Sequence, residues 1–372
     1  MTTLACHGPR LVGSFDMGLF KNHKQGLAMA ARTLGLSHDG DYTLRGEHQG
    51  IPVRVHLWSS RSDDSTNYYT TVDAGHPVPL RMSLAVTRQN VVGRFLRSAF
   101  GGQDLPTGHL QFDEQYRVRT LDPERAGVLL ADSGVRGAML GALSARRNQL
   151  SVTDVASSIT ISNWYSDPEE LRGMLNTTYA VADSIRSARG RVPLSDAEQR
   201  AQAALRDAAT SLGLPCDDAR LEVAGQRGRQ HAALRALYHP AGNWTTEFEV
   251  RFPASLEVGL RLLPQGGFWS TVGEFFGTQD IEVGHPAFDA KFKVKGKPED
   301  KIAALLTGQV ADRILALHAV AKELHVGDEG VRATAAGLMD DAPSLTRSIT
   351  VVEGLAGAIT ERAWGGPSAP YR

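Results

Sequence analysis

The sequence predicts an α+β protein built by tandem duplication of one domain, each copy a mainly antiparallel sheet with helices packed on one face. Three observations lead to this prediction. The chain has 372 residues, enough for two ordinary domains. It matches itself when shifted by about 176 residues, and both halves show the same order of helix-like and strand-like segments. We expect the two copies to form an intramolecular pseudo-dimer.

The clearest internal match pairs residues 101–120 with residues 277–296. The two stretches, GGQDLPTGHLQFDEQYRVRT and GTQDIEVGHPAFDAKFKVKG, are identical at eight of twenty positions, where unrelated stretches would agree at about one. The same offset pairs Asn67 with Asn243 and Thr70 with Thr246, and it drifts to 178 and 174 toward the two ends of the copies. Small insertions between homologous copies produce such a drift, so we infer a duplication.

The duplication also defines the expected domain boundaries. Between the copies the chain reads RGRVPLSDA, in which Pro193 stops a helix and Ser195 can cap the next one. We therefore expect an N-terminal arm, a first repeat domain, a linker, a second repeat domain and a loose tail, at 1–22, 23–188, 189–197, 198–364 and 365–372.

Each copy is expected to begin with an amphipathic helix, at 24–34 and 197–212, that ends at Gly35 or Gly213. Segments that alternate apolar and polar residues then predict strands. In the first copy these strands are 42–45, 51–58, 67–73 and 80–87, and in the second they are 220–224, 231–238, 244–252 and 256–262.

The second half of each copy is expected to contain a strand, a helix, a strand pair and a final helix. The even spacing of Phe112, Tyr116 and Val118 predicts one buried face of an extended segment. The helix that follows opens with proline and acidic residues, which suit a first turn. The expected strands are 115–120, 150–155 and 158–163, with counterparts at 292–295 and around 333–337; the expected helices are 123–143 and 167–186, with counterparts at 298–317 and 342–362.

Composition and charge argue against several classes of protein. Forty basic and forty-one acidic residues leave a net charge of -1. This balance argues against a nucleic-acid partner. The two cysteines, Cys6 and Cys216, form no CxxC pair, so we expect no metal site and a reducing compartment. No signal peptide is apparent at the start and no run of eighteen apolar residues occurs. We therefore expect a cytoplasmic protein without an integral membrane segment.

The motif Gly-His-x-x-Phe-Asp occurs in each copy and supplies the candidate catalytic residues His109, Asp113, His285 and Asp289. A histidine with an aspartate four residues later can act as an acid-base pair or bind a metal. The structural interpretation, which we favour, is that the glycine permits a left-handed turn and the aspartate accepts backbone hydrogen bonds. Duplication does not decide between the two, because folds and sites are both inherited.

A second repeated motif supplies the candidate ligand-binding residues Asn67, Tyr68, Asn243 and Trp244. The aromatic ring in each copy could line a pocket or stack on a ring-bearing ligand. An aromatic residue at the entry of a strand more often packs in the core, and we favour that interpretation.

Two apolar segments rich in aromatic residues are candidates for contact with a partner or a membrane. They are VVGRFLRSAF at 91–100 and FWSTVGEFF at 268–276. An exposed patch of this kind would mark an interaction site. We favour the structural interpretation, a short helix folded over the sheet, and the second segment lacks the basic residues that anionic lipid would attract.

The residues from Gly108 to Val118, and from Gly284 to Val294, follow the pattern G-x-x-x-F-D-x-x-F-x-V, with Tyr116 at the second aromatic position of the first copy. This pattern resembles bacterial domains of unknown function, in which the residue after glycine is commonly acidic. Here it is histidine in both copies. The resemblance implies a bacterial protein and no particular activity.

Three functional hypotheses follow. We favour a non-catalytic binding or interaction module, with a protein partner or a small apolar ligand, because no nucleotide-binding, metalloprotease or serine-hydrolase motif occurs. For the same reason we expect no cofactor. The first alternative is a hydrolase or metal-dependent enzyme that uses the repeated His/Asp pairs. The second is a peripheral lipid-binding protein that uses the aromatic segments.

Overall fold

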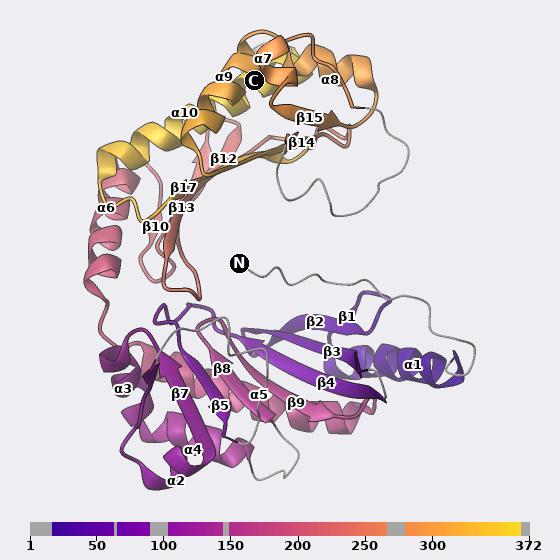
Figure 1. Cartoon of the computed structure of the whole chain (residues 1–372), viewed down its shortest axis with the longest axis vertical. Coiled ribbons are helices and arrows are strands. Elements are labelled where there is room, and N and C mark those ends of the chain that lie inside the picture. The colour runs from indigo at the N-terminus through magenta and orange to yellow at the C-terminus, as the bar shows by residue number, and fades with distance from the viewer. Residues whose placement is uncertain (1–16, 63–64, 90–102, 144–148, 266–279, 366–372) are drawn as a thin grey trace, which may run out of the picture. The chain divides into compact units, whose positions relative to one another are not determined.

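The computed structural model describes residues 17–62, 65–89, 103–143, 149–265 and 280–365 (Figure 1). The chain divides into two compact units. The first domain consists of Met1–Pro193 with Pro240–Gly242, and the second of Leu194–His239 with Asn243–Arg372.

The first domain contains a nine-stranded sheet in the order β1-β2-β3-β4-β9-β8-β5-β7-β6, in which every neighbouring pair is antiparallel. Its strands are β1 (Ser37–His38), β2 (Thr43–His48), β3 (Ile51–Ser62), β4 (Ser65–Gly75), β5 (Ala85–Arg88), β6 (Gln103–Asp104), β7 (Tyr116–Thr120), β8 (Gln149–Thr153) and β9 (Ala156–Ser162). Its helices are α1 (Met17–Leu34), α2 (Leu110–Gln115), α3 (Pro123–Ala131), α4 (Ser133–Ala142) and α5 (Pro168–Arg189).

The second domain repeats this plan in an eight-stranded antiparallel sheet of order β10-β11-β12-β13-β17-β16-β14-β15. Its strands are β10 (Cys216–Asp217), β11 (Glu222–Arg227), β12 (Gln230–Tyr238), β13 (Trp244–Arg251), β14 (Arg261–Pro264), β15 (Phe292–Lys295), β16 (Glu323–Gly327) and β17 (Gly330–Ala336). Its helices are α6 (Asp196–Leu212), α7 (Pro286–Asp289), α8 (Glu299–Leu306), α9 (Gln309–Val320) and α10 (Ala342–Trp364).

The strand orders of the two domains match one for one from β1 to β7 and from β10 to β15. This match confirms the predicted α+β fold and the tandem duplication. The pseudo-dimeric arrangement of the two copies stays a prediction.

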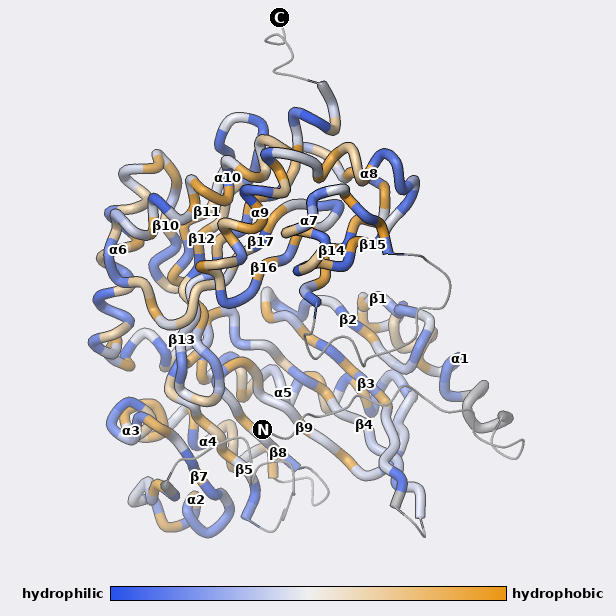
Figure 2. Tube along the Cα trace, turned by 45° about the horizontal axis from the view of Figure 1, so that its top comes forward, coloured by the Kyte–Doolittle hydropathy of each residue, from blue (hydrophilic) through white to orange (hydrophobic). Residues whose placement is uncertain are grey.

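Alternation along the strands places one face of each sheet under the helices (Figures 1 and 2). In β3, Ile51, Val53, Val55 and Leu57 are buried, while the residues between them are exposed or partly exposed. The buried residues form one core cluster per domain together with the inner faces of the helices. The opposite face of each sheet, which we call the open face, carries mainly polar side chains and is covered by no described helix of its own domain.

The aromatic residue of the repeated motif has the same surroundings in both copies. Phe112 and Phe288 are fully buried. Their rings lie 4.9 Å from Tyr116 and 5.1 Å from Phe292, respectively. The expectation that Phe112 belongs to an extended segment is wrong, because Phe112 lies in α2 and the strand begins only at Tyr116.

The segment between the copies confirms the predicted helix start. Ser195 caps α6 in a capping box with Glu198, and Gly213 ends this helix with a φ of 67°. At the other end of the first copy, α1 begins at Met17, earlier than the boundary expected at 23.

Two long helices expected from the sequence are each two helices. The first is interrupted at Asp132, whose carboxylate accepts hydrogen bonds from the backbone N–H groups of Gly134 and Val135 and so starts α4. The second is interrupted at Gly308, which has a φ of 58°. A continuous helix cannot include these conformations, so apolar periodicity alone overestimated both lengths.

The strands expected at 80–87 and 256–262 are largely loops, because a carboxylate from a distant segment shapes this part of each copy. Arg81 and Ser83 have φ values of 56° and 52°, which strands do not contain. Asp154 accepts hydrogen bonds from the backbone N–H groups of Met82, Ser83 and Leu84. In the second copy Asp328 does the same for Gly259 and Leu260.

Candidate binding surface

The repeated histidine and aspartate of the first copy hold the turn before α2. Gly108 has a φ of 76°, and the Nδ1 atom of His109 accepts the backbone N–H of Phe112 at 3.3 Å. The Asp113 carboxylate accepts the backbone N–H groups of Thr107 and Gly108, both at 3.0 Å. Both side chains therefore have structural partners in the backbone.

The second copy repeats this arrangement. His285 caps α7 through the backbone N–H of Phe288. Asp289 accepts the N–H groups of Val283, Gly284 and His285, each at 3.0 Å. The remaining imidazole nitrogen, Nε2, lies 3.1 Å from the exposed carboxylate of Asp312 in α9.

The second repeated motif contributes mainly through its threonine. Thr70 and Thr246 are buried, and each clamps the segment that leads to the last helix. The Thr70 hydroxyl donates to the carbonyl of Asn163 and accepts the N–H of Tyr165, both at 2.8 Å. The Thr246 hydroxyl donates to the carbonyl of Gly337 at 3.2 Å and accepts the N–H of Met339 at 3.0 Å. Sequence reasoning missed this role, because it concentrated on the neighbouring aromatic residues.

The aromatic members of that motif pack against other rings. Tyr68 lies 4.9 Å from the buried Trp164, and Trp244 lies 5.0 Å from Tyr238. Asn67 and Asn243 are exposed. Asn67 points to the open face, opposite Ser60 of β3, so the structure separates it from Tyr68 on the other face.

The segments 91–100 and 268–276 lie outside the described residues. Within the described ranges, no single helix is long and apolar enough to span a membrane. The bent pair α8 and α9 meets that criterion only as a unit, with an angle of 69° between the two helices. The inner residues of both helices belong to the core of the second domain.

Two other features of the described residues bear on chemistry. They contain no cluster of three or more His, Cys, Asp or Glu side chains that could hold a metal ion. Ser157 lies 3.1 Å from Nε2 of His76, whose Nδ1 lies 3.3 Å from the carbonyl of Asp154. This resembles an activated nucleophile, but Ser157 is fully buried and its hydroxyl is out of reach of a substrate. The matching positions in the second copy, Phe252 and Val331, are apolar.

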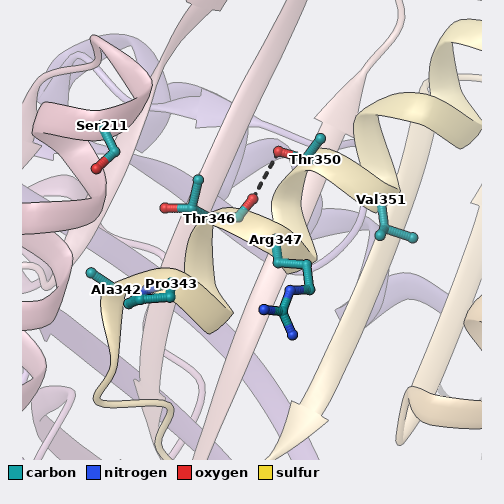
Figure 3. Close-up of a pocket in the computed structure, with 7 residues that line it drawn as sticks. All are labelled: Ser211, Ala342, Pro343, Thr346, Arg347, Thr350 and Val351. Atoms are coloured by element: carbon teal, nitrogen blue, oxygen red, sulfur yellow. Dashed lines mark hydrogen bonds between the residues drawn. The ribbon is translucent and has the colours of Figure 1, made fainter.

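A groove lies on the helical side of the second domain, between the end of α6 and the first half of α10 (Figure 3). Its volume is about 480 Å³, and its lining consists of Ser211, Ala342, Pro343, Thr346, Arg347, Thr350 and Val351. Most of the lining is apolar, and the Thr350 hydroxyl is used in a hydrogen bond to the carbonyl of Thr346. The corresponding part of α5 carries the ion pair of Arg172 and Glu169 instead.

The open face of the first domain carries a pair of stacked aromatic rings. Trp58 of β3 and Tyr69 of β4 are cross-strand neighbours, with ring centroids 4.4 Å apart and planes 22° apart. The Trp58 side chain is fixed by donation of its indole N–H to the Thr71 hydroxyl at 3.0 Å. That hydroxyl lies 2.9 Å from the hydroxyl of Thr160 on β9. We call these four residues the ring platform.

A polar cluster adjoins the ring platform. The Asp73 carboxylate accepts two hydrogen bonds from the Arg54 guanidinium, at 2.9 and 2.7 Å, and one from the Ser158 hydroxyl at 2.7 Å. His56 lies between this cluster and the rings, with Nδ1 3.9 Å from Asp73. Burial lowers the pKa of His56, although the charge of Asp73 opposes this effect.

The open face of the second domain differs at the same positions. The strand registers place Leu237 and Thr245 where the first domain has Trp58 and Tyr69. Arg235 replaces His56 and forms ion pairs with three glutamates at 2.6 to 2.9 Å: Glu222, Glu247 and Glu249. Burial opposes the ionisation of Glu249, but the hydrogen bonds and charges of Arg235 and Arg251 together outweigh burial and lower the pKa of Glu249. These charged side chains of the second open face therefore pair with one another.

Sequence reasoning missed the ring platform because it searched for residues shared by the two copies. The signal was present in the strand expected at 51–58, where Arg54, His56 and Trp58 occupy the polar positions of the alternation. An aromatic residue at such a position is expected on the exposed face.

Comparisons of the chain with models of known protein families, with curated proteins and with solved structures found no match. The resemblance of the repeated motif to bacterial domains of unknown function stays a prediction.

Proposed function

We propose that the protein is a non-catalytic binding protein whose ligand surface is the open face of the first domain. The proposal rests on a comparison of the two copies. They share the polar side chains that hold the fold, and they differ in the side chains of their open faces. The shared polar side chains serve the fold: His109 and His285 cap helices, and the aspartates and threonines described above accept backbone hydrogen bonds. These side chains already form hydrogen bonds with the backbone of their own domain.

The open faces, in contrast, have diverged. The second domain closes its face with an internal ion-pair network, whereas the first domain presents fixed aromatic rings beside hydroxyl groups and an ion pair. A rigid aromatic surface with a few oriented polar groups is what ligand sites use. This divergence supports the proposal that the first domain has the binding role.

The hydrolase alternative receives less support from the same contacts. Asp113 and Asp289 each accept backbone hydrogen bonds from the turn that contains them. Catalysis by the His/Asp pairs would require these carboxylates to give up those bonds. Loss of such a bond leaves a backbone donor unpaired, at a cost of about 1 kcal/mol or more.

Hydroxyl-radical footprinting of the full chain tests the proposal. The oxidation rates of Trp58 and Tyr69 are measured by mass spectrometry with and without extract from the source organism. We expect extract to lower both rates severalfold, because a bound ligand excludes solvent from the rings. Tyr238 and Trp244, a ring pair on the second domain, serve as internal controls. Unchanged rates at Trp58 and Tyr69, or equal protection of all four residues, would refute the proposal.

A further inference from the structure

We infer that the ring platform binds a neutral carbohydrate, an inference that rests on the proposed function. The geometry of the rings supports this inference. Trp58 is 37% exposed, and one ring face is occupied by the stack with Tyr69. Its indole N–H is already bound to Thr71. The platform is therefore held in place before a ligand arrives, and binding costs little side-chain entropy.

The polar groups around the rings also suit a sugar. Ser60 and Asn67 lie opposite each other on β3 and β4, next to the rings and on the same face. On the other side lie Asp73 and Arg54, whose planar carboxylate and guanidinium groups offer acceptors and donors. A sugar ring presents an apolar C–H face that packs on an aromatic ring and hydroxyl groups at its rim that pair with such groups.

The charges of the open face distinguish a sugar from a nucleic acid as the ligand. Bases also stack on aromatic rings, but phosphate groups require cations that are not already neutralised. On this face Arg45 pairs with Asp39, Arg54 with Asp73, and Arg117 and Arg119 with Asp104. Each described arginine of the face thus already has a carboxylate partner, with Asp104 shared by Arg117 and Arg119, and this pairing favours an uncharged ligand over a polyanion.

The experiment uses the full chain and a panel of soluble hexasaccharides with different linkages and sugars: cello-, malto-, xylo- and chitohexaose. Isothermal titration calorimetry measures the association constant, and tryptophan fluorescence reports on the rings. We expect at least one hexasaccharide to bind. The double variant Trp58→Leu/Tyr69→Thr, which carries the residues of the second domain, should bind it at least tenfold more weakly. Its thermal unfolding is compared with the wild type to verify folding.

The matched control is Leu237→Ala, at the position equivalent to Trp58 on the second domain, and it should bind as the wild type does. If no hexasaccharide binds while extract still protects Trp58 and Tyr69, this inference fails and the proposed function stands. If extract gives no protection either, both fail. Binding of a thymidine oligonucleotide instead of sugars, or equal sugar binding by the double variant, would also overturn the inference.

Discussion

Removal of the Asp154 carboxylate should destabilise the first domain more than removal of Asp328 destabilises the second. Asp154 is only 5% exposed and bonds to three backbone N–H groups that are themselves buried, those of Met82, Ser83 and Leu84. Asp328 bonds to two, at Gly259 and Leu260, of which the first is exposed. Asp154→Ala and Asp328→Ala therefore form a matched pair.

The expected magnitudes follow from the number of donors left unpaired. A buried donor without a partner costs about 1–3 kcal/mol. Burial raises the pKa of Asp154, although the three amides oppose this, so the variant also removes a carboxylate that is costly to bury. We expect Asp154→Ala to lower the free energy of unfolding of its domain by about 3–5 kcal/mol, and Asp328→Ala by about 1–2 kcal/mol.

Hydrogen exchange measured by mass spectrometry at increasing urea concentration reports on each domain separately, which a single fluorescence curve of a two-domain chain does not. The loops at 80–84 and 256–260 should show the earliest exchange in their variants. Asp154→Asn, which keeps one acceptor oxygen, should fall between wild type and Asp154→Ala. An equal loss in both alanine variants, or a loss below about 1 kcal/mol for Asp154→Ala, would refute the reasoning.

Further predictions concern buried and half-buried polar groups. Burial lowers the pKa of His76 to about 4 from 6.5, so the unfolded chain gains a proton below pH 6.5 that the folded chain takes up only near pH 4. His76 should lower the free energy of unfolding by up to about 3 kcal/mol over this window in urea titrations, and His76→Phe should remove this part of the pH dependence while the part due to other groups such as His56 persists. His76→Phe/Ser157→Val, which copies the second domain, should cost less than the sum of its two single variants in a double-mutant cycle, because no unpaired polar atom remains. Arg235→Met should leave three glutamates facing one another and lower the free energy of unfolding by about 2–4 kcal/mol at pH 7, a deficit that thermal melts should show shrinking toward pH 4. Phe112→Ala and Phe288→Ala should each cost about 3–5 kcal/mol in urea denaturation, because both rings are fully buried; unequal losses would contradict their equivalence.

Local patterns predicted most helices and strands because their causes are local. Gly213 ends α6 in a left-handed conformation and Ser195 caps its start, as expected from those residue types alone. Where the prediction failed, a distant side chain was responsible. Asp154 lies about seventy residues from the loop that it holds, and no local pattern in 80–87 reveals such a partner.

The candidate functional residues were likewise predicted from the sequence only in part. Sequence reasoning found the repeated His/Asp pairs and Asn67, and it predicted that the aspartates accept backbone hydrogen bonds, as they do in the structure. It did not find the ring platform. A search for agreement between copies selects residues that the shared fold requires, whereas Trp58 and Tyr69 differ from their counterparts Leu237 and Thr245.

The sequence by itself determined that this chain is a duplicated α+β protein, because residue periodicity and an internal match do not depend on how strands pair. Only the tertiary structure decided that Trp58 stacks on Tyr69 and that Thr71 and Thr160 lie beside them. That arrangement depends on cross-strand register, in which a shift of one residue would move every one of these side chains to the other face. Register is set by the packed core and by distant hydrogen bonds, so the binding surface exists only in the folded chain.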